Sequence, residues 1–280
     1  MNNFWTRALT GAVFVVVMVG GIWWSYWSIA ALFFAITAFG LWEFLSLVKL
    51  KGIYPQKILG TLLGISVMLF FTSINRLRDD YIQISTIAAL CIFTAIILFE
   101  LFRPSENPLA NIALPVFGVF YIVLPFGLLL LPCISGGIFS DMVFNSKIVL
   151  GYFFLLWSND TFAYLVGRTI GKTKLFERVS PKKTWEGTIG GVICTQGIAF
   201  LLSIYFTQLT LRDWIIVGAI VSIFGTLGDL VESMFKRSLS VKDSGTILPG
   251  HGGILDRFDG VFLSAPFAVA YIEMFAKISG

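Results

Sequence analysis

The chain has 280 residues, of which 57% are hydrophobic and 13% are charged, with 20 Lys and Arg against 16 Asp and Glu. Soluble domains carry about 25% charged residues and disordered chains are poor in apolar ones, so the composition excludes both classes. The apolar runs do not alternate with period two, which argues against a transmembrane β-barrel. The composition therefore predicts a polytopic helical membrane protein, and the net charge of +4 suits work beside anionic lipid or phosphate.

Apolar segments long enough to cross a bilayer recur along the whole chain. We expect an all-α transmembrane helical bundle of about nine spans, the first of them an N-terminal anchor. The expected spans are 8–24, 27–48, 57–73, 82–102, 109–134, 148–167, 189–206, 214–235 and 260–275. Pro115, Pro125 and Pro132 lie in the fifth span, so we expect that span to be kinked or split. Glu43 and Glu100 lie near span ends, where solvated or capping carboxylates are expected.

Lys and Arg are distributed unevenly between the two sets of loops. With nine spans, one set holds 15 of the 20 basic residues, including those of the two most polar loops, 168–187 and 236–259. Cytoplasmic loops are enriched in Lys and Arg, so this set and the N-terminus are expected inside, and the C-terminus outside. We expect a scaffold of about five spans in residues 1–147 and a catalytic region in residues 148–280, with its active site at the cytoplasmic face.

A stripe of polar side chains crosses the eighth expected span. Asp229, Glu232, Ser233 and Lys236 are spaced i, i+3, i+4 and i+7, so on a helix they share one face. Ionisable groups at membrane depth are costly and usually face a cavity or a partner. The alternative is a charge ladder that holds two helices together, a task for which buried polar groups are poorly suited.

The loop after this span carries carboxylates, glycines and the single histidine, His251. Asp256 and Asp259 are three residues apart at the start of the last span, where the helix dipole alone favours negative charge. Close to Asp229, they would repel one another unless a cation lay between them. Oxygen ligands without Cys or several His favour Mg²⁺ over Zn²⁺, so we predict a magnesium site at these three aspartates.

The other polar loop carries six basic residues against two acidic ones. Ser180 or Thr184 fits an N-cap of the following helix, with Pro181 near its first turn. Lys182 and Lys183 oppose the dipole of a helix N-terminus, so they indicate an anion nearby. Positive-inside charge alone is the alternative reason for these lysines.

Together these residues combine carboxylates for a cation, a ring of basic groups and glycine backbone, which is equipment for handling phosphates. The sequence contains no Walker A motif, kinase-type glycine-rich loop, GxSxG elbow or HExxH motif. The stretch from Ser233 to Asp259 resembles the signature of the phosphatidate cytidylyltransferases, also called CDP-diacylglycerol synthases. The matching residues are Lys236-Arg237, Lys242-Asp243-x-Gly245, Leu248-Pro249-Gly250-His251-Gly252-Gly253-Ile254 and Asp256-Arg257-Phe258-Asp259. Segments 160–172 and 180–187 are similar to further blocks of that family.

The resemblance implies an integral membrane enzyme that joins CTP and phosphatidic acid into CDP-diacylglycerol and pyrophosphate. It implies Mg²⁺ in a paired metal centre, a homodimer, and no nucleic-acid partner. The family's metal-binding aspartates map onto Asp229 and Asp256, with Asp259 close by. The lipid phosphate is expected to attack the α-phosphorus of CTP in line, with the acyl chains kept in the bilayer. The resemblance implies a bacterial plasma membrane or a eukaryotic internal membrane, and of these we expect the bacterial inner membrane.

These considerations assign roles to individual residues. The residues expected to carry catalysis are Asp229, Lys236, Arg237, His251, Asp256 and Asp259. The residues expected to bind substrate are Asp160, Lys182, Lys183, Lys242, Asp243, Gly252, Gly253 and Arg257. Which basic group meets which phosphate stays open, as does whether Asp160 serves the cytidine, the metal or packing. The alternatives are another CTP-using enzyme acting on an isoprenoid or ether lipid, a lipid kinase, and a transporter, although no interrupted helices in two corresponding halves are found.

Overall fold

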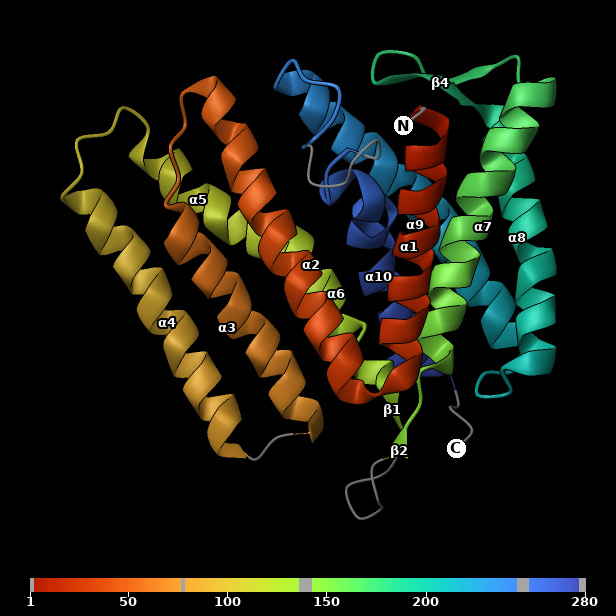
Figure 1. The fold of residues 1–280 in the computed structure, drawn as a ribbon, viewed down its shortest axis with the longest axis horizontal. Coiled ribbons are helices and arrows are strands. Elements are labelled where there is room, and N and C mark those ends of the chain that lie inside the picture. Colours follow the sequence, from red (N-terminus) through yellow and green to blue (C-terminus); the bar gives the residue numbers. More distant parts are fainter. Residues whose placement is uncertain (1–2, 77–78, 136–142, 246–251, 277–280) are drawn as a thin grey trace. The chain divides into compact units, whose positions relative to one another are not determined.

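Figure 1 shows the computed structural model, which describes residues 3–76, 79–135, 143–245 and 252–276. Most of these residues are helical. The α-helices are α1 (Asn3–Trp24), α2 (Tyr26–Leu47), α3 (Lys57–Arg76), α4 (Asp79–Leu101), α5 (Pro108–Gly118), α6 (Leu124–Leu128), α7 (Lys147–Ile170), α8 (Trp185–Tyr205), α9 (Leu211–Ser238) and α10 (Leu255–Phe275). The other helical turns are η1 (Val48–Lys51), η2 (Val119–Val123) and η3 (Leu131–Cys133). Two antiparallel hairpins pair β1 (Ile134–Ser135) with β2 (Val143–Phe144), and β3 (Lys174–Phe176) with β4 (Ser180–Thr184).

The helices agree with the spans expected from hydropathy. Within the described residues, eight helical segments are long and apolar enough to cross a membrane, and α1 adds a shorter apolar stretch, Leu9–Trp24. Each of the expected spans coincides with one of these segments to within a few residues. The chain is therefore a multi-pass helical membrane protein, as the composition predicts.

The fifth expected span is divided, which confirms the prediction from its prolines. It runs as α5, the π-helical turn η2 and the short helix α6. Pro115 lies inside α5 and Pro125 lies in the first turn of α6. Because proline has no N–H and its ring crowds the preceding turn, a regular α-helix cannot continue through this segment.

The chain divides into two compact units, each assembled from segments that are distant in the sequence. Unit 1 comprises residues 1–21, 27–131 and 238–257, and unit 2 comprises residues 22–26, 132–237 and 258–280. Most of the signature stretch belongs to unit 1, whereas the polar stripe of α9 belongs to unit 2.

Within unit 1, glycines let the helices pack closely. A Cβ atom at Gly64 of α3 would lie 2.7 Å from Leu41 of α2, and one at Gly60 would lie 3.1 Å from Pro115 of α5. Small residues at such contacts are typical of helix packing in membranes, where van der Waals contact is a main source of association. α3 also runs beside α4 (Figure 1).

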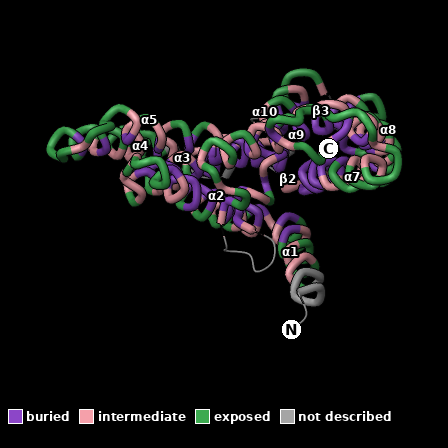
Figure 2. The backbone as a smooth tube through the Cα atoms, turned by 90° about the horizontal axis from the view of Figure 1, so that it is seen from above, coloured by how far each residue is buried: buried purple, intermediate pink, exposed green. Residues whose placement is uncertain are grey.

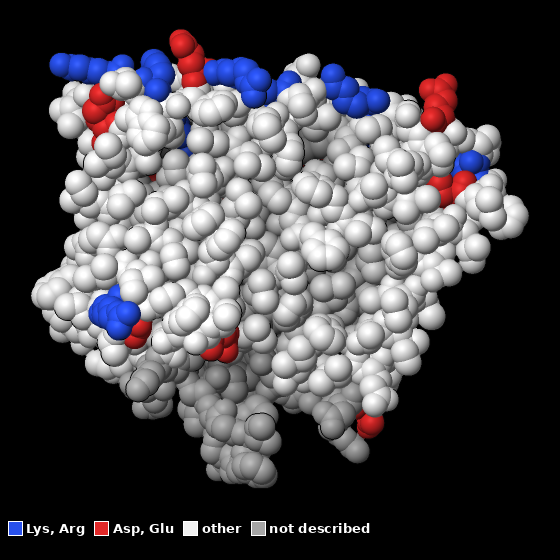
Figure 3. All heavy atoms as spheres, turned by 180° about the vertical axis from the view of Figure 1, so that it is seen from behind, with Lys and Arg blue, Asp and Glu red and all other residues white. Residues whose placement is uncertain are grey.

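Large apolar side chains face outward along the helices. In the most apolar 18-residue stretch of α4, 11% of the residues are buried, and in the corresponding stretch of α8, 28% are buried. Figure 2 shows the exposed residues along both helices, and Figure 3 shows a face whose middle is free of Lys, Arg, Asp and Glu, which lie toward its upper and lower parts. Exposure of so many large apolar side chains is unlike a water-soluble protein and fits contact with lipid.

Candidate active site

The polar stripe predicted for the eighth span lies on α9. Ser233 Oγ donates a hydrogen bond of 3.3 Å to Asp229 Oδ1, and Lys236 Nζ lies 2.5 Å from Glu232 Oε2. Glu232 is buried, with 3% of its surface exposed. The residues at i, i+3, i+4 and i+7 therefore share one face, as the spacing predicts.

A close approach of two helix backbones brings a third carboxylate to this stripe. In unit 2, a Cβ atom at Gly228 of α9 would collide with the carbonyl oxygen of Asp259 and lie 3.2 Å from Gly260 Cα. Gly225, one turn earlier, also faces Gly260. Because neither glycine carries a side chain, α9 and α10 meet at the level of Asp229 and Asp259.

The result is a cluster of three carboxylates. Asp229, Glu232 and Asp259 each contribute one carboxylate oxygen, and these three oxygens lie within 4.8 Å of one another. Asp259 Oδ1 also accepts a 2.8 Å hydrogen bond from the N–H of Gly260. Three like charges this close repel strongly unless positive charge lies among them, and the donor set, all carboxylate oxygen, suits a hard divalent cation.

Basic and acidic groups from two further elements reach the carboxylate cluster. Lys183 of β4 forms an ion pair with Asp229 through Nζ and Oδ2. Asp160 of α7 lies near enough to Lys183 and Asp229 for all three charges to interact. The structure thus brings together Asp160, Lys183, Asp229 and Asp259, four residues that the sequence predicts to belong to the site.

The hairpin that carries Lys183 is fixed at the start of α8. Thr184 is the N-cap, and its Oγ1 accepts a 3.2 Å hydrogen bond from the N–H of Gly187. The Glu186 carboxylate accepts from the N–H groups of Lys172 and Thr173, at 3.1 and 3.0 Å. These contacts tie both ends of the hairpin to the first turn of the helix.

The prediction that Pro181 lies near the first turn of a helix is wrong, because this segment is a strand of the hairpin. Pro181, Lys182 and Lys183 lie on β4 and not in the first turn of a helix, and Thr184, not Ser180, is the cap. The helix begins at Trp185 because Thr184 still has extended backbone angles, while its side chain accepts from the first turn of the helix. Lys183 therefore meets its acidic partner across the unit, whereas Lys182 is exposed.

Asp256 occupies a different setting, within unit 1. Its Oδ2 accepts three hydrogen bonds, from Ser244 N at 2.9 Å, Ser244 Oγ at 2.9 Å and Gly253 N at 2.8 Å. Gly252, at φ +82°, makes the turn that aims the next N–H at this carboxylate. Asp256 thus holds Ser244 and Gly253 to one carboxylate, and it precedes Asp259 by three residues on the first turns of α10.

Glu43 of α2 completes this arrangement from 200 residues away in the sequence. It accepts hydrogen bonds from Ser244 Oγ, from Ile254 N at 3.0 Å and from Leu255 N at 3.2 Å. Glu43 is buried, with 4% exposed, so it is a capping carboxylate but not a solvated one. Glu100 is likewise buried and accepts a 2.6 Å bond from Asn111 Nδ2.

Of the remaining residues expected at the site, five are exposed, one is buried and one lies outside the described part of the chain. The exposed ones are Lys182, Arg237, Lys242, Asp243 and Arg257. Gly253 is buried and its N–H is taken by Asp256. His251 lies outside the described residues.

Two residues have places that the sequence does not predict. Glu232 was expected on the polar stripe but not among the metal ligands, although its i+3 spacing from Asp229 is the signal that would have included it. Glu43 is predicted to be a solvated or capping carboxylate, and the structure makes it a cap, but no local pattern connects it to Ser244.

The fold and the cluster define a multi-pass helical membrane protein in which carboxylates and lysines gather at one site, the kind of site that handles phosphate groups. The chain belongs to the Cytidylyltransferase family, whose sequence model matches residues 5–275.

Individual relatives agree with this assignment. The phosphatidate cytidylyltransferase of Haemophilus influenzae is 33% identical over 251 residues, which cover 83% of this chain and 85% of that protein. The proteins of the same name from Staphylococcus aureus strain COL and Staphylococcus haemolyticus are 52% identical over 120 residues. That match covers 42% of this chain and spans 46% of each staphylococcal protein, a little under half of its length.

Proposed function

We propose that the protein is a phosphatidate cytidylyltransferase, which transfers CMP from CTP to phosphatidic acid and releases pyrophosphate. The observation that carries the proposal is the convergence of Asp229, Glu232 and Asp259 beside Lys183 and Lys236. Membership in the family and the names of the relatives support the same activity.

The carboxylate cluster fits a divalent cation by its donors and by its charge. Asp160, Asp229, Glu232 and Asp259 supply four negative charges when ionised, and the paired Lys183 and Lys236 return two positive charges. One divalent cation would neutralise the remainder. We infer that Asp229, Glu232 and Asp259 hold Mg²⁺. Asp256 lies at the same end of α10 as Asp259, and we propose it as a further ligand. When bound, Mg²⁺ would supply charge neutralisation and polarisation at a phosphoryl group.

The other residues have roles that follow from their charge and position. Lys183 and Lys236 are held at the cluster by ion pairs, so their ammonium groups are positioned before any phosphate arrives. The exposed Lys182 and Arg237 can meet phosphate oxygens from the solvent side. The lipid phosphate is itself the nucleophile, and because a phosphate monoester is largely dianionic at pH 7, the site needs no strong protein base.

The remaining parts of the proposal concern the setting of the enzyme. The distribution of Lys and Arg favours a cytoplasmic active site, and the relatives are bacterial, which favours a bacterial inner membrane. We propose that residues 1–147 form a scaffold and that residues 148–280 form the catalytic region. The homodimer rests on the resemblance alone and is testable by the mass of the purified protein in detergent.

The experiment that tests the activity follows two labels of CTP. Purified protein is incubated with phosphatidic acid, Mg²⁺ and CTP labelled at either the α- or the γ-phosphate. The proposal predicts that α-label enters the lipid as CDP-diacylglycerol and that γ-label leaves as pyrophosphate. Label from the γ-phosphate in the lipid would identify a kinase instead.

A competition assay separates the proposed acceptor from related lipids. Phosphatidic acid, an isoprenoid phosphate and an ether-linked phosphatidic acid are offered together, and the labelled products are resolved by mass. Preferential labelling of diacyl phosphatidic acid supports the proposal, and preferential labelling of either of the other two lipids would contradict it.

A further inference from the structure

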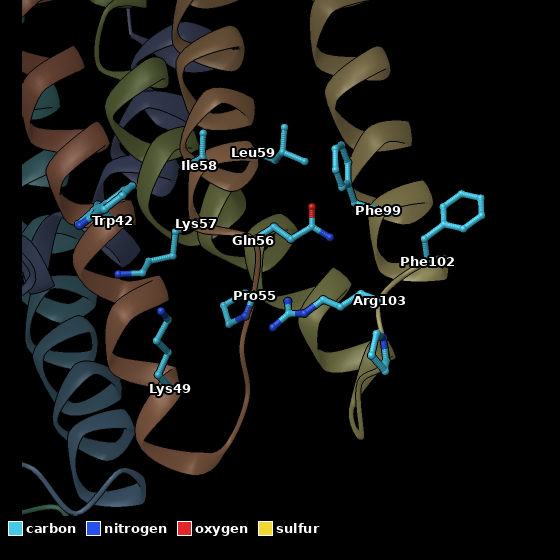
Figure 4. A pocket seen from close by; sticks show the side chains of 11 residues that line it. Trp42, Lys49, Pro55, Gln56, Lys57, Ile58, Leu59, Phe99, Phe102 and Arg103 are labelled. Atoms are coloured by element: carbon cyan, nitrogen blue, oxygen red, sulfur yellow. The ribbon is translucent and has the colours of Figure 1, made fainter.

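Unit 1 contains a pocket that shares no residue with the carboxylate cluster. Its volume is about 820 Å³, and it lies among the ends of α2, α3 and α4. Figure 4 shows its side chains: the charged ends of Lys49, Lys57 and Arg103 lie toward one end, and apolar side chains such as Ile58 and Phe99 lie toward the other. The pocket is therefore amphipathic along the direction of the helices.

The three cations come from three helix ends. Lys49 lies in η1 after α2, Lys57 is the first residue of α3, and Arg103 follows α4. Lys49 and Lys57 lie near enough for their positive charges to repel each other. Within the described part of the chain, neither lysine forms an ion pair, whereas Arg103 lies 3.7 Å from Glu100. The pocket thus carries positive charge at Lys49 and Lys57 that no described carboxylate pairs with.

Two of these cations are held in place by uncharged groups. Lys57 Nζ donates a 2.7 Å hydrogen bond to Ser46 Oγ and lies 4.7 Å from the centre of the Trp42 ring. The Arg103 guanidinium donates a 2.7 Å bond to the carbonyl oxygen of Tyr54. Their positions are therefore fixed before an anion binds, which reduces the entropy that binding would cost.

The apolar part of the pocket is open to its surroundings. Phe102 is 83% exposed, Ile58 is 67% exposed and Phe99 is 63% exposed. In a membrane protein such side chains face lipid, and Trp residues near helix ends, such as Trp42 of this pocket, lie at the level of the headgroups. A ligand that suits the whole pocket therefore has an anionic head and hydrocarbon chains.

We propose that this pocket binds an anionic glycerophospholipid of the surrounding bilayer. Its phosphate lies among Lys49, Lys57 and Arg103, and an acyl chain runs along Ile58 and Phe99. Because the pocket supplies net positive charge, it prefers a lipid with a net negative headgroup, such as phosphatidylglycerol, over a zwitterionic one, such as phosphatidylcholine.

The test counts bound lipids by native mass spectrometry on the full-length protein purified in detergent. Wild type and variants are mixed with equal amounts of phosphatidylglycerol and phosphatidylcholine. The double variant Lys49→Gln/Lys57→Gln is expected to bind phosphatidylglycerol at least about tenfold more weakly than wild type. Lys51→Gln is the matched control, because Lys51 is exposed in the same turn η1 but does not line the pocket.

The outcomes distinguish a lipid site from a contact between two copies of the chain. Equal retention of phosphatidylglycerol by the double variant and the Lys51 control would overturn the proposal, as would equal binding of the two lipids by wild type. A change from dimer to monomer with unchanged lipid retention would identify the pocket as an interface between copies and would also overturn it. If the double variant fails to fold, the single variant Lys49→Gln is tested instead, because Lys49 is exposed. A severalfold loss of phosphatidylglycerol binding is still expected for it.

Discussion

Glu43 and Ser244 lie 201 residues apart in the sequence and share a buried hydrogen bond. Through this bond and two others to the N–H groups of Ile254 and Leu255, an early helix holds the residues at which α10 opens. The N-terminal helices therefore do more than anchor the chain, because one of them supplies an acceptor to Ser244 and to the start of α10.

Replacing Glu43 by Ala should destabilise unit 1 and lower activity. The change leaves the N–H groups of Ile254 and Leu255 without an acceptor in a buried position, at a cost of about 1–3 kcal/mol for each unsatisfied group. Thermal unfolding in detergent measures the first effect and turnover of CTP measures the second. Glu106→Ala is the matched control, because Glu106 is an exposed carboxylate of the same unit. Equal melting temperatures for the two variants would contradict the capping role.

Replacing Gly228 by Ala should separate α9 from α10. The added Cβ would collide with the Asp259 carbonyl oxygen, so the carboxylate cluster would open and both stability and turnover would fall. Gly197→Ala in α8 is the same substitution where no atom lies within 4 Å, and there Ala should stabilise by about 0.5–1 kcal/mol. Melting temperatures that move in the same direction for both variants would contradict the close approach of the two helices.

Replacing Lys183 by Met should lower turnover far more than replacing Lys174 by Met. Both lysines belong to the β3–β4 hairpin, but Lys183 pairs with Asp229 while Lys174 is exposed. Loss of the ammonium group removes a fixed positive charge from the cluster, and we expect at least a tenfold effect on kcat/KM at fixed Mg²⁺. The proposed role of Lys183 is wrong if the two variants have the same kcat/KM.

Asp256→Asn should leave folding nearly intact and cut turnover by orders of magnitude. Asparagine keeps one side-chain oxygen that can accept from Ser244 and Gly253, so the loop retains its acceptor, while the charge for a cation is lost. Thermal unfolding and CTP turnover are measured on the same preparation. Near-normal turnover would remove Asp256 from the proposed metal set and leave it a purely structural acceptor.

The parts of the fold that could be predicted depend on local sequence. Span positions follow from hydropathy, and the division of the fifth span follows from Pro115 and Pro125, because both effects act within a few residues. The shared face of Asp229 and Glu232 follows from the helix period in the same way. The β3–β4 hairpin was missed, since a short polar strand such as Ser180–Thr184 has no alternating apolar pattern to mark it.

The parts that could not be predicted depend on contacts between distant segments. Lys183 meets Asp229 across 46 residues, and Glu43 meets Ser244 across 201. The close approach of Gly228 to Asp259 decides that Asp259 joins Asp229 and Glu232, and that approach depends on how two helices cross, which no single helix encodes. The amino-acid sequence alone indicates which residues belong to the site, but it does not indicate which of them contact each other.

The measurement that tests the carboxylate cluster most directly is the binding of Mn²⁺, a paramagnetic substitute for Mg²⁺, to the purified protein by electron paramagnetic resonance. Wild type should bind Mn²⁺ without nucleotide, and Asp229→Asn and Glu232→Gln should each weaken this binding at least about tenfold. Glu177→Gln, at an exposed carboxylate in the turn of the hairpin, should bind like wild type. Equal Mn²⁺ affinity in wild type and in both cluster variants would contradict a cation site at Asp229, Glu232 and Asp259.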